Sequence, residues 1–110
     1  MIFIVVKFAV RPDVADQWLT RVAPFTAATR AEPGNVFFEW SKSVDRPNQF
    51  VLLEAFRDCA AGEAHVHSEH FQAAMAWMPD MIAATPEIIH VEVPGASWAT
   101  MAELQPRTAQ

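Results

Sequence analysis

Residues 32–71 decide the fold of this chain, and they read EPGNVFFEWSKSVDRPNQFVLLEAFRDCAAGEAHVHSEHF. Two runs in this stretch, 36–43 and 50–56, are rich in the aromatic and aliphatic residues that favour strands. The residues between them, 45–48, are Asp-Arg-Pro-Asn, which is turn chemistry. Two strands joined by a short polar link predict an antiparallel β-hairpin.

The hairpin is followed by a helical segment with three histidines. Asp58 is the expected N-cap, and His65, His67 and His70 come after it. Titratable side chains among so many apolar residues are typical of small-ligand pockets, whose walls are apolar with a few convergent polar groups. The sequence therefore predicts a pocket beside this helix.

On either side of this stretch, residues 2–10 predict a first strand and residues 87–93 a fourth. Between the first strand and the hairpin, apolar residues recur at helical spacing over 14–29, and Asp13 is the expected cap of that helix. Pro24 should bend or divide it, because proline lacks the backbone donor and clashes with the preceding turn.

The second helical region contains residues that can end one helix and start another. Ser68 can re-cap it for a stretch that ends at Trp77, and Pro79 can open one further turn. The order β-α-β-β-α-β predicts an α+β, ferredoxin-like fold with a four-stranded antiparallel sheet. We expect a single domain over residues 1–94 and a C-terminal tail over residues 95–110.

The first strand is apolar on both faces, with Ile2, Val6 and Phe8 on one and Phe3 and Val5 on the other. Two helices can cover only one face of the sheet. We therefore expect a homodimer that buries sheet against sheet in a barrel-like core.

Composition and charge exclude several classes of function. The chain is 52% hydrophobic and 19% charged, and its net charge of −5 argues against binding nucleic acid or an anionic membrane. The apolar N-terminus is too short to span a bilayer. The single cysteine, Cys59, favours a reducing, cytoplasmic compartment, and we expect it to be a small packing residue.

Short motifs along residues 1–94 carry a family resemblance. They are Glu32-Pro-Gly-Asn, Phe38-Glu39-Trp40, Asp45-Arg-Pro-Asn, Glu54-Ala-Phe-Arg-Asp, Ala64-His65, Ser68 and His70-Phe71. With them the chain resembles the antibiotic biosynthesis monooxygenase-like family of dimeric α+β barrels. The resemblance implies that the protein could oxidise a quinol or anthrone with dioxygen and no cofactor, as some members do. Other members degrade haem, isomerise small signals or have no assigned activity.

The resemblance implies that His65 is the helix-borne histidine that faces the cavity. An imidazole there could take a proton from a phenolic hydroxyl, with Glu54 to orient it and His70 as a second catalytic candidate. Structural roles stay open for all three. His65 could bond to Glu54 or to backbone, Glu54 could pair with Arg57 or Arg30, and His70 could belong to the cap at Ser68.

Aromatic and thioether side chains could form the walls for a flat substrate, although ordinary core packing explains most of them equally well. The candidates are Trp40, Phe25, Phe56, Phe71 and Met75, with Trp77 and Met78 beside them. Two other tryptophans, Trp18 and Trp98, are expected at a subunit interface.

We expect no metal. His67 and His70 are spaced to chelate, but no third ligand follows them in the sequence, and a structural zinc site needs four. The leading hypothesis is a cofactor-independent monooxygenase that acts on a quinol or similar aromatic. The alternatives are a small-molecule binding protein without turnover, or an isomerase that uses the same histidine.

Overall fold

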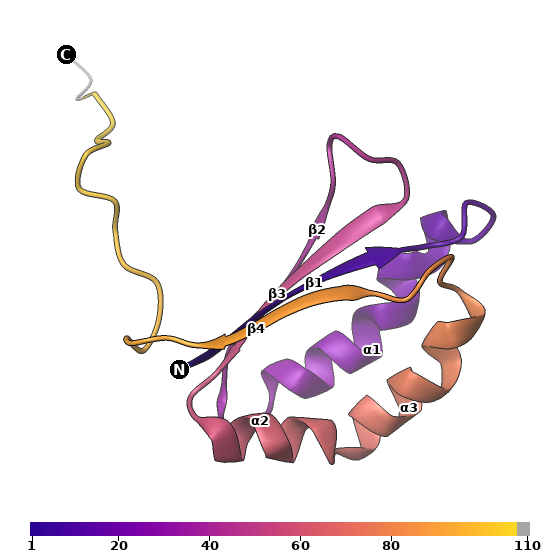
Figure 1. Ribbon diagram of the computed structural model, residues 1–110, viewed down its shortest axis with the longest axis horizontal. Coiled ribbons are helices and arrows are strands. Elements are labelled where there is room, and N and C mark those ends of the chain that lie inside the picture. Colours follow the sequence, from indigo (N-terminus) through magenta and orange to yellow (C-terminus); the bar gives the residue numbers. More distant parts are fainter. Residues whose placement is uncertain (108–110) are drawn as a thin grey trace.

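A computed structural model describes residues 1–107 and contains the predicted order of elements (Figure 1). The elements are β1 (Ile2–Ala9), a 3₁₀ turn η1 (Ala15–Gln17), α1 (Trp18–Arg30), β2 (Asn35–Lys42), β3 (Gln49–Phe56), α2 (Cys59–Val66), α3 (Glu69–Trp77), a second 3₁₀ turn η2 (Met78–Asp80) and β4 (Glu87–Glu92). The four strands form one antiparallel sheet in the order β2-β3-β1-β4. The predicted α+β, ferredoxin-like fold is confirmed.

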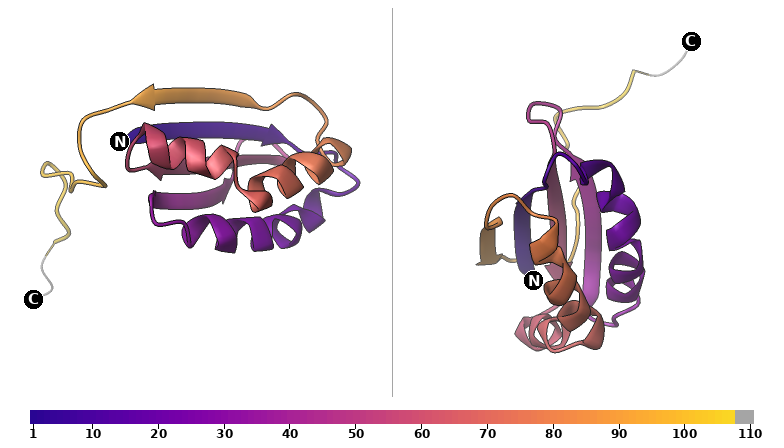
Figure 2. Two further views of the ribbon diagram at one scale, coloured as in Figure 1. Left: turned by 90° about the horizontal axis from the view of Figure 1, so that it is seen from below. Right: turned by 90° about the vertical axis from the view of Figure 1, so that its right-hand side faces the viewer.

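All the helices lie on one face of this sheet, which we call the covered face (Figure 2). In its left panel, α1 lies towards the β2 edge of the sheet, and α2 and α3 cross the middle strands. No helix lies over β4, and all six of its residues are exposed. The covered face is therefore closed at the β2 edge and open at the β4 edge.

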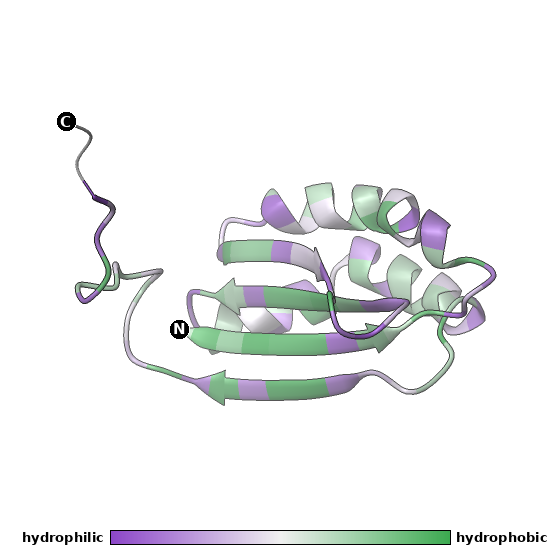
Figure 3. Cartoon of the chain, turned by 90° about the horizontal axis from the view of Figure 1, so that it is seen from above, coloured by the Kyte–Doolittle hydropathy of each residue, from purple (hydrophilic) through white to green (hydrophobic). Residues whose placement is uncertain are grey.

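Strand alternation divides the apolar residues of β1 between the two faces. Ile2, Ile4, Val6 and Phe8 are buried under the helices. On the opposite side, the open face, Phe3 and Val5 are partly exposed and Lys7 and Ala9 are exposed. Figure 3 looks onto the sheet and shows hydrophobic colouring along most of β1 and along part of β4. The prediction that both faces are apolar is confirmed.

Two of the three predicted helix caps are confirmed. The side chain of Asp58 accepts from the backbone N–H of Ala61, and Ser68 accepts from that of Phe71. The prediction for Asp13 is wrong, because its carboxylate pairs with Arg11 at 2.7 Å and the chain first makes the turn η1. The neighbouring guanidinium offers Asp13 a charged donor, which competes with the neutral helix N–H groups.

The first helix decides between the two outcomes predicted for Pro24. Pro24 does not divide the helix, since α1 runs without a break from Trp18 to Arg30, and a bend stays a prediction. Trp18 is not at an interface but fully buried in the core, with ring centroids 5.3 Å from Phe8 and 5.8 Å from Trp40. Burial of so large a side chain anchors the start of α1, and this packing outweighs the one hydrogen bond that Pro24 removes.

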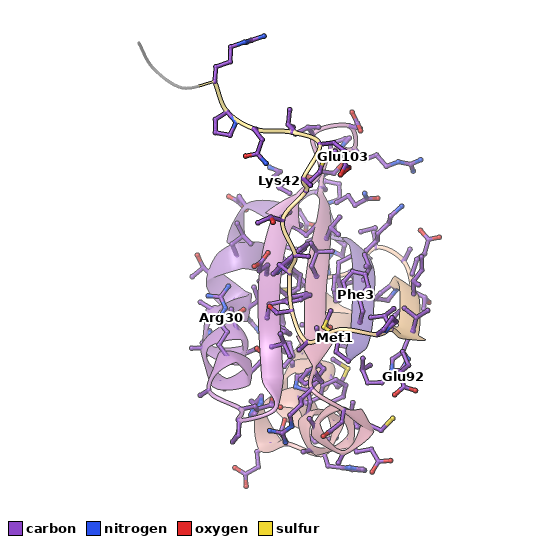
Figure 4. All side chains as sticks on the ribbon, turned by 90° about the vertical axis from the view of Figure 1, so that its left-hand side faces the viewer. Met1, Phe3, Arg30, Lys42, Glu92 and Glu103 are labelled. Atoms are coloured by element: carbon purple, nitrogen blue, oxygen red, sulfur yellow. The ribbon has the colours of Figure 1, made fainter. Side chains whose placement is uncertain are left out.

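The tail forms no helix or strand between β4 and residue 107. Trp98 is 62% exposed but stacks on Phe37 of the open face at 5.0 Å between ring centroids. Figure 4 shows the tail in front of the sheet, on its way from the Met1 end towards Glu103. An interface role for Trp98 stays a prediction. Over residues 1–107, no helix is long and apolar enough to cross a bilayer.

Candidate active site

A pocket of about 520 Å³ lies between the covered face and the helices α2 and α3. Its walls are mostly apolar, and its volume suits a small organic ligand. The lining residues come from every strand except β2 and from all three α-helices: Ile2, Ile4, Val6, Phe8, Phe25, Leu52, Glu54, Phe56, Cys59, Gly62, Glu63, His65, Val66, Phe71, Met75, Met78, Pro86, Ile88 and His90.

Most of the residues predicted for the site do line this pocket. They are His65, Glu54, Phe25, Phe56, Phe71 and Met75. Trp40 is wrongly predicted as a wall residue, because it points into the core between α1 and the sheet. Its indole N–H donates to the hydroxyl of Thr26 at 2.8 Å, so packing and this bond together hold it away from the pocket.

Glu32, which had no predicted role, is the hydrogen-bond partner of His65. Its Oε2 lies 2.8 Å from Nδ1 of His65 and 2.6 Å from Nε2 of His70. A carboxylate accepts hydrogen bonds, so it favours the His65 tautomer with the proton on Nδ1. The lone pair of His65 is then on Nε2, on the side of Glu54.

Gly34 allows the loop that carries Glu32 to approach α2. A Cβ added at Gly34 would collide with Cβ of Ala61, one turn before His65. Only glycine therefore fits where the loop after α1 meets α2. The sequence signal was present in the motif Glu32-Pro33-Gly34, but spacing along the chain did not indicate that it meets His65.

Burial controls the ionisation of the two central groups. Desolvation lowers the pKa of His65 from its usual value, and the hydrogen bond that His65 donates to Glu32 offsets this only in part, so the imidazole is neutral at pH 7. Desolvation, with a smaller contribution from the negative charge of Glu32, raises the pKa of Glu54 to about 7. The pocket thus presents a neutral base beside a carboxylic acid that holds its proton near neutrality.

The expected roles of Glu54 need correction. Its Oε1 lies 3.8 Å from Nε2 of His65, beyond hydrogen-bond distance, so Glu54 does not orient the imidazole. It has no arginine partner either, since Arg57 pairs with Asp58 and Arg30 donates to the carbonyl of Phe38. An unpaired buried carboxyl group is stable mainly in its protonated form, in agreement with the raised pKa.

His70 does not line the pocket but contacts Glu32 from behind His65. Glu32, His65 and His70 offer donor atoms within 4.8 Å of one another, which is the one group in residues 1–107 with an arrangement that could hold a cation. The contacts of 2.6 and 2.8 Å are hydrogen-bond distances. A carboxylate that accepts from two imidazole N–H groups accounts for the cluster.

Two further predictions about α2 can be checked. His67 is exposed, as predicted. Cys59 is not a buried packing residue, since it is exposed at the start of α2 and lines the edge of the pocket.

The family is shown by comparison with known proteins. A sequence model described as "Antibiotic biosynthesis monooxygenase" matches residues 1–77. The chain belongs to this family. It is 28% identical over 93 residues to "Putative monooxygenase YcnE" of Bacillus subtilis, a match that covers 84% of this chain and 98% of YcnE.

Solved structures share the fold. Rv0793 from Mycobacterium tuberculosis superimposes with a TM-score of 0.79 at 23% identity, over 87% of this chain and 98% of its own. A "putative antibiotic biosynthesis monooxygenase" from Caulobacter crescentus gives a TM-score of 0.81 at 23% identity, over 86% of this chain and 90% of its own. At these identities the likeness shows a common fold.

Proposed function

We propose that this protein is a cytoplasmic monooxygenase that oxidises a quinol or similar hydroxylated aromatic with dioxygen, without a cofactor. The observation that carries the proposal is the hydrogen bond between Glu32 and His65 at the wall of an apolar pocket. Membership of the antibiotic biosynthesis monooxygenase family and the similarity to YcnE support the choice of reaction.

In the first step, His65 removes a proton from the substrate. The substrate O–H bond breaks and an N–H bond forms at Nε2, while Glu32 holds the proton already on Nδ1. The resulting imidazolium lies against the Glu32 carboxylate, which stabilises its charge as the carboxylate does in other histidine–carboxylate pairs. The substrate anion is electron-rich and can pass an electron to dioxygen directly.

The remaining steps balance without another reactant. The reduced dioxygen joins a ring carbon, and the O–O bond then breaks. One oxygen atom stays on the ring and the other leaves as water, so that quinol and dioxygen give a hydroxyquinone and water. All the electrons come from the substrate. In this scheme Glu54, whose pKa is raised to about 7, gives a proton to the departing oxygen.

Oxygen consumption with a panel of reduced quinones and anthrones tests this proposal. We expect uptake above the autoxidation rate, and a loss of roughly 10²- to 10⁴-fold in His65→Ala, because general-base catalysis has this magnitude. His67→Ala is the matched control, since His67 is exposed on the same helix and does not line the pocket. An equal loss in both variants, or no uptake with any compound, would reject the monooxygenase assignment.

An isomerase is the second candidate, because the pocket holds a neutral base and a protonated acid 3.8 Å apart. Such a pair can take a proton from one atom of a substrate and return it to another without oxygen. Turnover of an enolisable substrate under nitrogen, lost in His65→Ala, would favour this function over oxidation.

We also propose that two copies of the chain pair through their open faces. The supporting observation is that large apolar side chains are exposed there, among them Ile89 at 64% and Val91 at 39%. Exposed apolar patches of this kind are typical of subunit contacts. Light scattering that gives a monomer mass at micromolar concentration would contradict the dimer.

A further inference from the structure

The sheet that forms the pocket floor carries polar groups at two separate ends, Glu54 on β3 and His90 on β4. Glu54 and His65 form the inner end, where the helices cover the sheet, and His90 lies at the outer end on β4. Ile4 on β1 is in register with both Glu54 on β3 and His90 on β4. The three side chains therefore form one row across the pocket floor, with an apolar residue in the middle.

Strand spacing fixes the length of this row. Adjacent strands lie about 4.8 Å apart, so the Cα atoms of Glu54 and His90 are separated by roughly 10 Å. The surface between them is apolar, since it is formed by Ile4 and its neighbours Val6 and Ile88. A single aromatic ring is too short to reach both ends, whereas two or more fused rings can.

His90 is available to a ligand. No helix covers β4, and Ile88, two residues away on the same face, is 61% exposed. Within residues 1–107, the side chain of His90 makes no hydrogen bond or ion pair with the protein. A neutral imidazole offers one donor and one acceptor, so it can bind either a hydroxyl or a carbonyl group.

We propose that His90 determines substrate specificity by binding a second oxygen atom at the far end of a flat, fused-ring substrate. This inference rests on the proposed function, in which the reacting hydroxyl lies against His65. The ligand class is an aromatic of two or more fused rings with a hydroxyl or carbonyl at each end and apolar edges between them. Such a molecule matches the row Glu54, Ile4 and His90, which presents a polar, an apolar and again a polar surface.

The test compares two ligands that differ by one distal hydroxyl, 2-naphthol and 2,6-dihydroxynaphthalene. Dissociation constants are measured by calorimetry under nitrogen, where no oxidation occurs. The parent protein should prefer the diol by roughly three- to tenfold, the value of one hydrogen bond. His90→Leu should remove this preference, and His90→Gln should keep part of it. His67→Leu, at an exposed histidine outside the pocket, is the control and should behave like the parent.

The outcomes separate this inference from the proposed function. If 2-naphthol binds and the diol preference is absent, or persists in His90→Leu, the assignment of His90 is overturned while the aromatic pocket stands. If neither ligand binds the parent protein, both the proposal of an aromatic substrate and the proposed role of His90 are rejected.

Discussion

The covered and open faces of the sheet are built from the same kinds of residue but differ in what lies against them. Under the helices, Val6 and Phe8 of β1 belong to the buried core. On the open face, Phe3 and Val5 of the same strand stay partly exposed, and no helix packs over them. Hydrophobicity alone therefore does not locate the site. A pocket forms where a helix layer meets the sheet and brings polar groups with it.

The contrast predicts unequal effects at adjacent residues of β3. Leu52 is buried on the covered face and Leu53 is half-buried on the open face. Leu52→Ala should lower the free energy of unfolding by about 2–5 kcal/mol, since it leaves a cavity in the core. Leu53→Ala should cost about 1 kcal/mol or less when the protein is dilute enough to be monomeric. Urea denaturation measures both, and equal losses would mean that the open face is as well packed as the covered one.

The second prediction concerns Glu54, the buried acid of the covered face. Its pKa rises from 4.5 to about 7 on folding, so between these pH values the folded chain binds more protons than the unfolded chain. The contribution of Glu54 to stability is thus complete below pH 4.5 and is lost as the pH rises to about 7. Over this range, the unfolding free energy of the parent should fall relative to Glu54→Gln by up to about 3 kcal/mol.

Thermal denaturation at a series of pH values would measure this difference between the parent and Glu54→Gln. Glu39→Gln is the control, because Glu39 is exposed on the neighbouring strand β2. A parent and a Glu54→Gln variant with parallel pH profiles would show that Glu54 ionises in the folded protein as readily as in the unfolded one.

The third prediction tests the loop that brings Glu32 to the pocket. Gly34→Ala should force the loop away from Ala61 and destabilise the protein by about 1–3 kcal/mol, as overpacking does. Because Glu32 would move from His65, turnover should fall roughly 10- to 100-fold, the usual effect of losing the group that orients a histidine. Gly62→Ala is the control for stability alone, since a Cβ there meets no atom within 4 Å but Gly62 lines the pocket. Turnover equal to that of the parent in Gly34→Ala would show that Glu32 has no role in the reaction.

The smallest change in the stability of the folded chain is expected on the open face. Ile89→Lys should convert a dimer to a monomer and change the unfolding free energy of the monomer by less than about 0.5 kcal/mol. The midpoint of denaturation should depend on protein concentration for the parent and not for the variant. Val44→Lys, in the exposed hairpin turn, is the control. A concentration-independent midpoint in the parent would contradict pairing through this face.

Local sequence signals predicted much of this structure correctly. The caps at Asp58 and Ser68 and the hairpin depend on residues only a few positions apart, where side-chain chemistry acts directly on the backbone. Local signals can fail even at short range, as at Asp13, because Arg11 competes with the helix N–H groups for its carboxylate. Local signals also do not predict contacts between distant elements, as at Trp18, whose spacing on α1 did not distinguish a core position from an interface position.

Local patterns in the chain were enough to predict the order of the elements, the two apolar faces and the presence of His65 on a helix after Glu54. Folding was needed to show that Glu32, 33 residues before His65, is its partner, and that His90 lies on the same pocket floor as Glu54. The physical reason is that periodicity tells which side of an element a residue is on, whereas contacts across a pocket depend on how separate elements pack. Gly34 illustrates this, because the space that it leaves is defined by Ala61 of another element.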